Sequence, residues 1–210
     1  MYDDTASYRR IGDNMDDRLR KQMDFILEVD KLKKIGRQTY LSDASRKEND
    51  SEHSWHLALM AVLLSEHSNR EIDVLKAVTM VLIHDIVEID AGDTYAYDTA
   101  GNITKREREV AAADRIFNLL PSDQAEYFRE LWEEFEEGAS AEAQFAITLD
   151  KTQPVMLNSA SGGKSWREHE VCRSQIMKRN ENTHKGSEAM WEYVDGIIKD
   201  NIDKGNIIDK

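Results

Sequence analysis

Over most of its length, the chain places apolar residues at the spacing of an α-helix. In the first such stretch, Leu19, Met23 and Ile26 recur three or four residues apart and would share one helix face. Eight stretches show this spacing, at about residues 18–36, 54–68, 74–89, 104–120, 122–137, 140–157, 165–179 and 187–202. We find no convincing strand, internal repeat or interdomain linker between them. The pattern therefore predicts an all-α fold, a compact bundle of non-parallel helices.

Two of the predicted helices carry apolar residues on most of their faces, which is typical of helices at the centre of a bundle. They are the stretches 54–68 and 74–89, and Gly92 is expected to end the second one. Trp55 and Trp132 are both expected in the core.

Local signals mark further helix features. Thr104 and Glu107 form a capping-box signature at the start of the helix that ends near Leu120. Pro154 follows Asp150 by four residues and has no N–H to donate to the Asp150 carbonyl, so we expect a kink or a rerouted carbonyl there.

Length and composition indicate one domain. Residues 1–16 show no periodicity and are expected to form a loose tail, and residues 17–210 are expected to form a single domain that includes the C-terminal helices. The single cysteine, Cys172, excludes an internal disulfide. No apolar leader precedes the first helix, and no apolar run is long enough for a membrane span, so a cytoplasmic protein is expected.

The formal net charge of −13 restricts the partners. A strongly acidic chain repels polyanions at long range, so neither a nucleic acid nor an anionic membrane surface is expected as a partner. A small anionic substrate remains compatible if cations or a metal dominate locally.

The stretch VLIHDIVEIDAGD, residues 81–93, combines an apolar first half with several ionisable residues. His84, Asp85, Glu88 and Asp93 all lie in its second half. Burying an ionised carboxylate without a partner costs several kcal/mol. Glu88 follows His84 by four residues and would share its face of a continuous helix, so a cation held there would neutralise the acids.

Two other apolar helices bring similar groups inward. The second helix opens with SEHSWH, which contains His53 and His56, and Asp150 interrupts the apolar run of the sixth helix. Spacing alone does not decide which of these two histidines is the metal ligand. Two imidazoles and two carboxylates suit a first-row divalent metal with positions left open for water.

The order His, His-Asp, Asp on successive buried helices resembles the HD-domain metal-dependent phosphohydrolase superfamily. Within it, the chain is most similar to the branch that contains the 5′-deoxynucleotidases. The segments LKKIGR, SEHSWH, HDIVEIDAGD and LPSDQAEYFRELWEEFEEGASAEAQFAITLD carry the resemblance, which covers roughly residues 19–158.

The resemblance implies a role for each matching residue. His53, His84, Asp85 and Asp150 match the metal ligands. Glu88 and Asp93 match catalytic positions near the reacting phosphate, and Arg37 matches an arginine that holds the phosphate. Gln38 stands where the deoxynucleotidases have a tryptophan that excludes the ribose 2′-hydroxyl, so strict selectivity for deoxynucleotides is not expected.

The expected function is a metal-dependent phosphomonoesterase that hydrolyses nucleoside 5′-monophosphates. The resemblance implies one divalent ion as the cofactor (Mn, Co, Mg, Zn, Ni or Fe). HD proteins with two metals resemble one another in having extra histidines in the interval that corresponds to His84–Asp150, and this chain has none there. The family implies a homodimer. The alternatives are hydrolysis of another phosphorylated metabolite or a phosphodiester, and a non-enzymatic helical protein with a structural metal.

Overall fold

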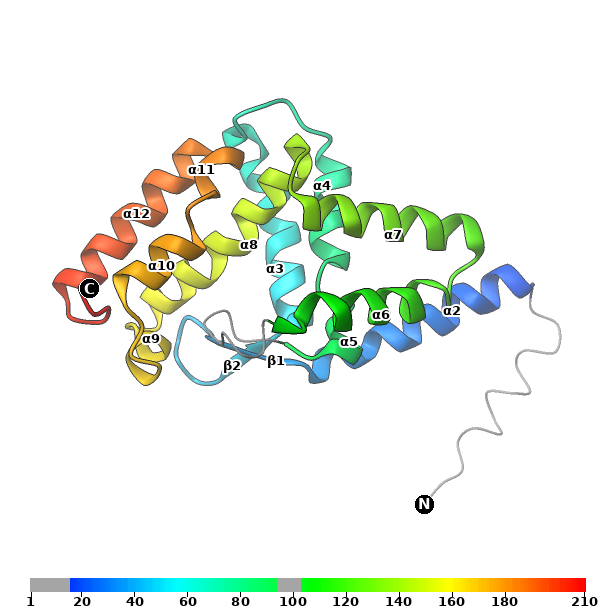
Figure 1. The fold of residues 1–210 in the computed structure, drawn as a ribbon, viewed down its shortest axis with the longest axis horizontal. Coiled ribbons are helices and arrows are strands. Elements are labelled where there is room, and N and C mark those ends of the chain that lie inside the picture. The colour runs from blue at the N-terminus through cyan, green and yellow to red at the C-terminus, as the bar shows by residue number, and fades with distance from the viewer. Residues whose placement is uncertain (1–15, 94–102) are drawn as a thin grey trace, which may run out of the picture.

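The computed structural model describes residues 16–93 and 103–210, and helices dominate it (Figure 1). The longer helices are α2 (Asp17–Val29), α3 (Asp50–Leu64), α4 (Val74–Ile83), α6 (Lys105–Phe117), α7 (Ser122–Glu137), α8 (Ala141–Ala160) and α12 (Glu188–Asp203). The shorter elements are η2 (Asp30–Lys34), η3 (Ser65–His67), α5 (Glu88–Ala91), α9 (Lys164–Glu168), α10 (Arg173–Arg179), α11 (Thr183–Gly186) and two strands. The predicted helical fold is confirmed.

The expected loose tail lies outside the described residues except for Asp16, whose side chain caps α2 by accepting a hydrogen bond from the Leu19 amide at 3.3 Å. Most of the polar loop before α6 also lies outside them. The division into a tail and one domain therefore stays a prediction. Within the described residues, no helix is both long and apolar enough to cross a membrane.

Helix α8 organises the bundle, because it packs against α3, α4, α7, α11 and α12 (Figure 1). Its first half, which includes Phe145 and Leu149, belongs to the large core formed with α3, α4, α6 and α7. In its second half, Val155 joins a smaller core with Trp166 and residues of the C-terminal helices. One continuous helix thus links both cores, and Asp150 lies between them.

A short antiparallel hairpin precedes α3, so the expectation of no strand was wrong. Strand β1 (Gly36–Tyr40) pairs with β2 (Lys47–Asn49), in an irregular register from Gly36↔Asn49 to Tyr40↔Lys47. This polar segment lacks the alternating pattern that identifies strands in a sequence. The hairpin places Arg37 beside the start of α3, where Asn49 forms a capping box with Glu52.

The predicted helix 74–89 breaks at the His-Asp pair. Helix α4 ends at Ile83, and the next residues form tight turns in which the Glu88 amide donates to the Asp85 carbonyl at 2.9 Å. Hydrogen bonds between residues three apart wind the backbone more tightly than the four-residue spacing of an α-helix. Glu88 therefore does not lie on the same helix face as His84. Gly92 ends α5 with a φ of 74°, as expected of a terminating glycine.

Other local expectations had mixed outcomes. Thr104 does precede α6, but its hydroxyl accepts from Arg108 at 2.6 Å and makes no capping bond, so the predicted capping box is absent. Trp132 is fully buried as expected, but the expectation that Trp55 lies in the core was wrong, since Trp55 is 65% exposed. Helix α8 continues through Pro154, and the expected kink stays a prediction.

The predicted helix 165–179 is divided into α9 and α10. Glu170 lies between them with a φ of 49°, a left-handed conformation that a continuous α-helix does not contain.

Gly186→Ala should destabilise the fold, because α11 lies directly on α8. A Cβ at Gly186 would come within 2.3 Å of the Gln144 carbonyl oxygen and 2.4 Å of the Thr148 hydroxyl. Backbone cannot move aside as a side chain can, so we expect a loss of about 1–3 kcal/mol in the free energy of unfolding, measured by urea denaturation. Gly196→Ala is the matched control: it lies in α12 with nothing within 4 Å of its Cβ position, and should stabilise by up to about 1 kcal/mol. Equal effects of both substitutions would contradict the packing argument.

Candidate metal centre

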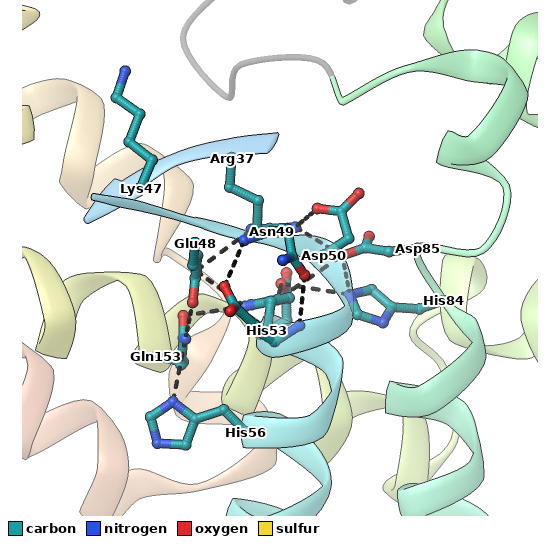
Figure 2. Close-up of polar contacts among 12 residues, drawn as sticks. Arg37, Lys47, Glu48, Asn49, Asp50, His53, His56, His84, Asp85 and Gln153 are labelled. Atoms are coloured by element: carbon teal, nitrogen blue, oxygen red, sulfur yellow. Dashed lines mark hydrogen bonds and ion pairs between the residues drawn. The ribbon is translucent and has the colours of Figure 1, made fainter. Parts of the chain in front are cut away.

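The four predicted metal ligands converge from three parts of the fold. His53 lies in the first turns of α3, His84 and Asp85 follow α4, and Asp150 lies in α8. His53 Nε2 is 3.0 Å from Asp150 Oδ1. His84 Nε2 is 3.0 Å from Asp85 Oδ2 (Figure 2). His84 Nε2 is 3.7 Å from Asp150 Oδ1, and His53 Nε2 is 4.0 Å from Asp85 Oδ2. Two imidazole nitrogens and two carboxylate oxygens therefore face one point.

The local backbone orients the His84 ring. Its Nδ1 donates to the Val81 carbonyl at 2.9 Å, which leaves Nε2 to face the carboxylates. That Nε2 is buried and has no hydrogen-bond partner among the described residues, because its approach to Asp85 lacks hydrogen-bond geometry. A buried ring nitrogen with a free lone pair is what a metal ligand requires.

His56 lies outside this cluster. Its Nδ1 is 3.3 Å from the Gln153 amide nitrogen, on the side of Gln153 away from the carboxylates (Figure 2). Of the two histidines that the spacing left open, the geometry favours His53.

Asp85 also belongs to a second cluster, which consists of acids alone. Asp50, Asp85 and Glu88 are all buried, and one carboxylate oxygen of each lies within 4.8 Å of the others. Arg37 donates through Nη1 to Asp85 at 2.7 Å and to Asp50 at 3.1 Å, and its Nε is 3.6 Å from Glu48. The predicted phosphate-binding arginine is thus held among three carboxylates.

Arg37 alone does not balance the negative charge of the buried carboxylates at the centre. Burial, followed by the charge of Asp85, raises the pKa of Asp50 to about 7. Burial and the charges of Asp85 and Asp50 raise the pKa of Glu88 to about 11. Burial opposes the charged form of His84, but Asp85 and Asp150 outweigh it and raise its pKa to about 10. Glu88 and His84 therefore hold protons where no cation is present. The charges and hydrogen bonds of the histidines outweigh burial and keep the pKa values of Asp85 and Asp150 below their usual range.

These residues fit a divalent cation. The cluster combines imidazole and carboxylate donors without cysteine. His84 Nε2, Asp50 Oδ2 and Glu88 Oε2 are buried and have no hydrogen-bond partner in the part of the chain that the structure describes. That donor set suits a first-row divalent ion with open coordination positions better than it suits a closed structural zinc site.

A pocket of about 160 Å³ opens onto the carboxylate side of the centre. Asp85 and Asp150 line it together with the predicted residues Arg37, Gln38, Glu88 and Asp93. The two histidines lie behind this wall. Burial raises the pKa of Asp93 against the opposing charge of Arg37. The structure therefore brings every sequence-predicted site residue to one place, and the chemical role of each remains a proposal.

The sequence analysis missed several residues of the site. Glu48 and Asp50 gave no signal because they lie in a charged segment, where buried acids look like exposed ones. Gln153 follows Asp150 by three residues and would share its helix face, which was the available signal. Lys105, Lys151 and Arg179 also line the pocket, and they come from helices whose arrangement the sequence does not reveal.

Added divalent ion should raise the melting temperature of the wild-type protein. Ion at 100 times its Kd would stabilise the folded state by about 2.7 kcal/mol. Asp150→Asn should lose most of that shift, since Asp150 faces both histidines. Asp24→Asn, at an exposed position of α2, should keep it. Thermal melts of chelator-treated protein with and without Mn²⁺ or Co²⁺ measure the shift, and an unchanged shift in Asp150→Asn would contradict the assigned centre.

The comparisons with known proteins agree with this geometry. Residues 29–191 match the family model of the HD domain. The chain is 32% identical over 139 residues to the 5′-deoxynucleotidase HDDC2 of Bos taurus and to that of Homo sapiens, which covers 65% of this chain. It spans 66% of the length of these relatives.

A solved structure gives a longer match. The crystal structure of a predicted metal-dependent phosphohydrolase from Magnetospirillum magnetotacticum MS-1 superposes with a TM-score of 0.88 at 44% identity, over 91% of this chain and 96% of that one. The resemblance seen in the sequence is confirmed. Because the family model covers most of the chain and the His/Asp cluster is assembled, the chain belongs to the HD domain family.

Proposed function

We propose that the protein is a phosphomonoesterase that uses one divalent metal ion to hydrolyse nucleoside 5′-monophosphates to nucleoside and phosphate. The carrying observation is a buried His/Asp cluster whose carboxylates form the wall of a pocket that also contains Arg37. The HDDC2 relatives are named 5′-deoxynucleotidases, and the 44% identical structure is described as a metal-dependent phosphohydrolase, which supports the same chemistry.

The charge of the pocket favours an anionic substrate. Four cations and four acids line its described part: Arg37, Lys105, Lys151 and Arg179 against Asp85, Glu88, Asp93 and Asp150. A divalent ion would add two positive charges to this balance. A phosphate dianion would then be attracted to one place on a chain with a formal net charge of −13.

The ion is one of Mn, Co, Mg, Zn, Ni or Fe, and His53, His84, Asp85 and Asp150 would hold it. When bound, it would lower the pKa of water and neutralise charge on the phosphoryl group. Arg37 uses Nη1 for Asp85 and Asp50, and its Nη2 makes no hydrogen bond to a described residue. We assign Arg37 to orient the phosphate, since phosphoryl transfer depends on positioning and charge neutralisation.

Glu88 and Asp93 would act beside the reacting phosphate. Both line the pocket, and burial favours the protonated form of each carboxyl group. The attacking water forms the new P–O bond and loses a proton, and the bond to the 5′-oxygen breaks as that oxygen takes a proton. We assign Asp93 to orient or deprotonate the attacking water, or to protonate the leaving oxygen. We assign Glu88 to orient the metal ligands or the water network around the phosphate.

The pocket is small compared with sites of about 300–1,000 Å³ that enclose whole ligands. The phosphate and sugar would occupy it, and the base would extend beyond the described wall. Another phosphorylated metabolite is the second candidate, because little in this part of the pocket selects a base. A purely structural ion is disfavoured, because the cavity lies directly beside Asp85, Asp93 and Asp150. The homodimer and the cytoplasmic location remain proposals.

Phosphate release from a panel of ribo- and deoxynucleoside 5′-monophosphates tests the proposal. Wild-type protein refilled with a divalent ion should turn over at least one of them. Asp85→Ala should abolish the turnover, because Asp85 Oδ2 joins Arg37 to His84. Asp24→Ala is the matched control on the exposed side of α2. No turnover of any nucleotide despite stoichiometric ion binding would contradict the proposal.

Gln38→Trp should increase selectivity for deoxynucleotides. Gln38 lines the pocket, and its side-chain oxygen accepts from Lys47, which leaves the amide nitrogen to meet a hydroxyl. The bulky indole of tryptophan in place of this amide would crowd a 2′-hydroxyl. We expect similar kcat/KM for dAMP and AMP in the wild type, and a ratio at least about tenfold higher in Gln38→Trp, since one steric or hydrogen-bond difference is worth 1–3 kcal/mol. An unchanged ratio would show that Gln38 does not contact the sugar.

A further inference from the structure

Gln153 lies directly behind the metal centre and is not among the described residues that line the pocket beside it. It is fully buried in α8, and its side-chain oxygen is 3.1 Å from His53 Nδ1 (Figure 2). Its amide nitrogen donates to Glu48 Oε2 at 2.9 Å and lies 3.3 Å from His56 Nδ1. Three residues from α3 and the hairpin thus surround one amide group.

The partners of Gln153 decide which way its amide points. A carboxylate only accepts hydrogen bonds, so Glu48 takes the NH₂ group and the carbonyl oxygen must face His53. A rotated amide would put its oxygen against the Glu48 carboxylate and its NH₂ against the ring. The second N–H of Gln153 faces His56 Nδ1, which can accept it.

The amide in turn decides which nitrogen of His53 carries the proton. A carbonyl oxygen can only accept, so His53 Nδ1 must donate to it. The neutral ring then has its lone pair on Nε2, the nitrogen that is 3.0 Å from Asp150 and faces the cluster. Glu48 Oε1 is 3.6 Å from His53 Nδ1, which is too long for a hydrogen bond that would replace Gln153.

We propose that Gln153 is a positioning residue that holds His53 with Nε2 free for the metal, and that Glu48 imposes this orientation on Gln153. The inference rests on the proposed role of His53 as a metal ligand and not on the identity of the substrate. The competing explanation is that Gln153 only fills the space between α8 and the hairpin.

Exchanging the two side chains separates these explanations. Gln153→Glu alone places a second carboxylate against that of Glu48, and the two negative charges repel each other. We expect it to weaken metal affinity about 10- to 100-fold, the usual range for residues that support metal ligands. In Glu48→Gln/Gln153→Glu, the amide at position 48 donates to the carboxylate at position 153, which still accepts from His53 Nδ1. Metal affinity should return to within about threefold of wild type.

The readouts are metal titration of chelator-treated protein and the ¹⁵N and ¹H spectra of the histidines in Zn²⁺-loaded protein. Wild type and the double exchange should both show His53 with a proton on Nδ1 and the metal on Nε2. Thr152→Val is the matched control, because Thr152 is buried in the same helix and its hydroxyl has no partner among the described residues. It should leave the affinity unchanged. Methionine is about as long as glutamine but forms no such hydrogen bonds, so Gln153→Met should also weaken the metal affinity. This variant replaces Gln153→Glu if the latter does not fold.

A folded double exchange that binds metal no better than Gln153→Glu or Gln153→Met would overturn the inference. So would wild-type affinity in Gln153→Met. A wild-type protein that binds no divalent ion would instead contradict the proposed function, so the two failures are distinguishable.

Discussion

The structure depends on the burial of several acids around one arginine. Asp50 is fully buried, and Glu48 and Glu88 are nearly so. The Asp85 carboxylate accepts a hydrogen bond from Arg37 and forms an ion pair with His84. Removing one partner from such a group costs far more than an exposed ion pair is worth, about 3–5 kcal/mol against 0–1. The β1–β2 hairpin places Arg37 among these acids. Helix α8 supplies the remaining charge by placing Asp150 between the two cores.

The same constraint explains the break in the predicted helix 74–89. A continuous α-helix would have kept Glu88 on the face of His84, in the imidazole group. The tight turns after Ile83 instead place Glu88 with Asp50 and Asp85. Asp85 therefore borders two different environments, with histidines on one side and carboxylates and Arg37 on the other.

The sequence revealed those site residues that contrast with their neighbours. His84, Asp85 and Asp150 interrupt apolar runs, and His53 stands at the opening of an apolar helix. Together they pointed to a cation. Glu48, Asp50 and Gln153 stand among polar residues, and only the paired strands and the packing of α8 show that they are buried. The helices were recoverable because periodicity extends over many residues. The hairpin and the turn after Ile83 depend on contacts between distant segments, which no local pattern records.

Arg37 connects the metal centre to the pocket because it shares Asp85 with the histidines. Its Nη1 is 2.7 Å from Asp85 Oδ2, the oxygen that also lies 3.0 Å from His84 Nε2. Any cation that draws on Asp85 must weaken the hold of that carboxylate on Arg37, since one oxygen cannot fully neutralise both. The guanidinium would then have more of its charge available to an anion in the pocket. The two halves of the site are therefore electrostatically coupled through a single oxygen, so a change on either side alters the charge that the other presents.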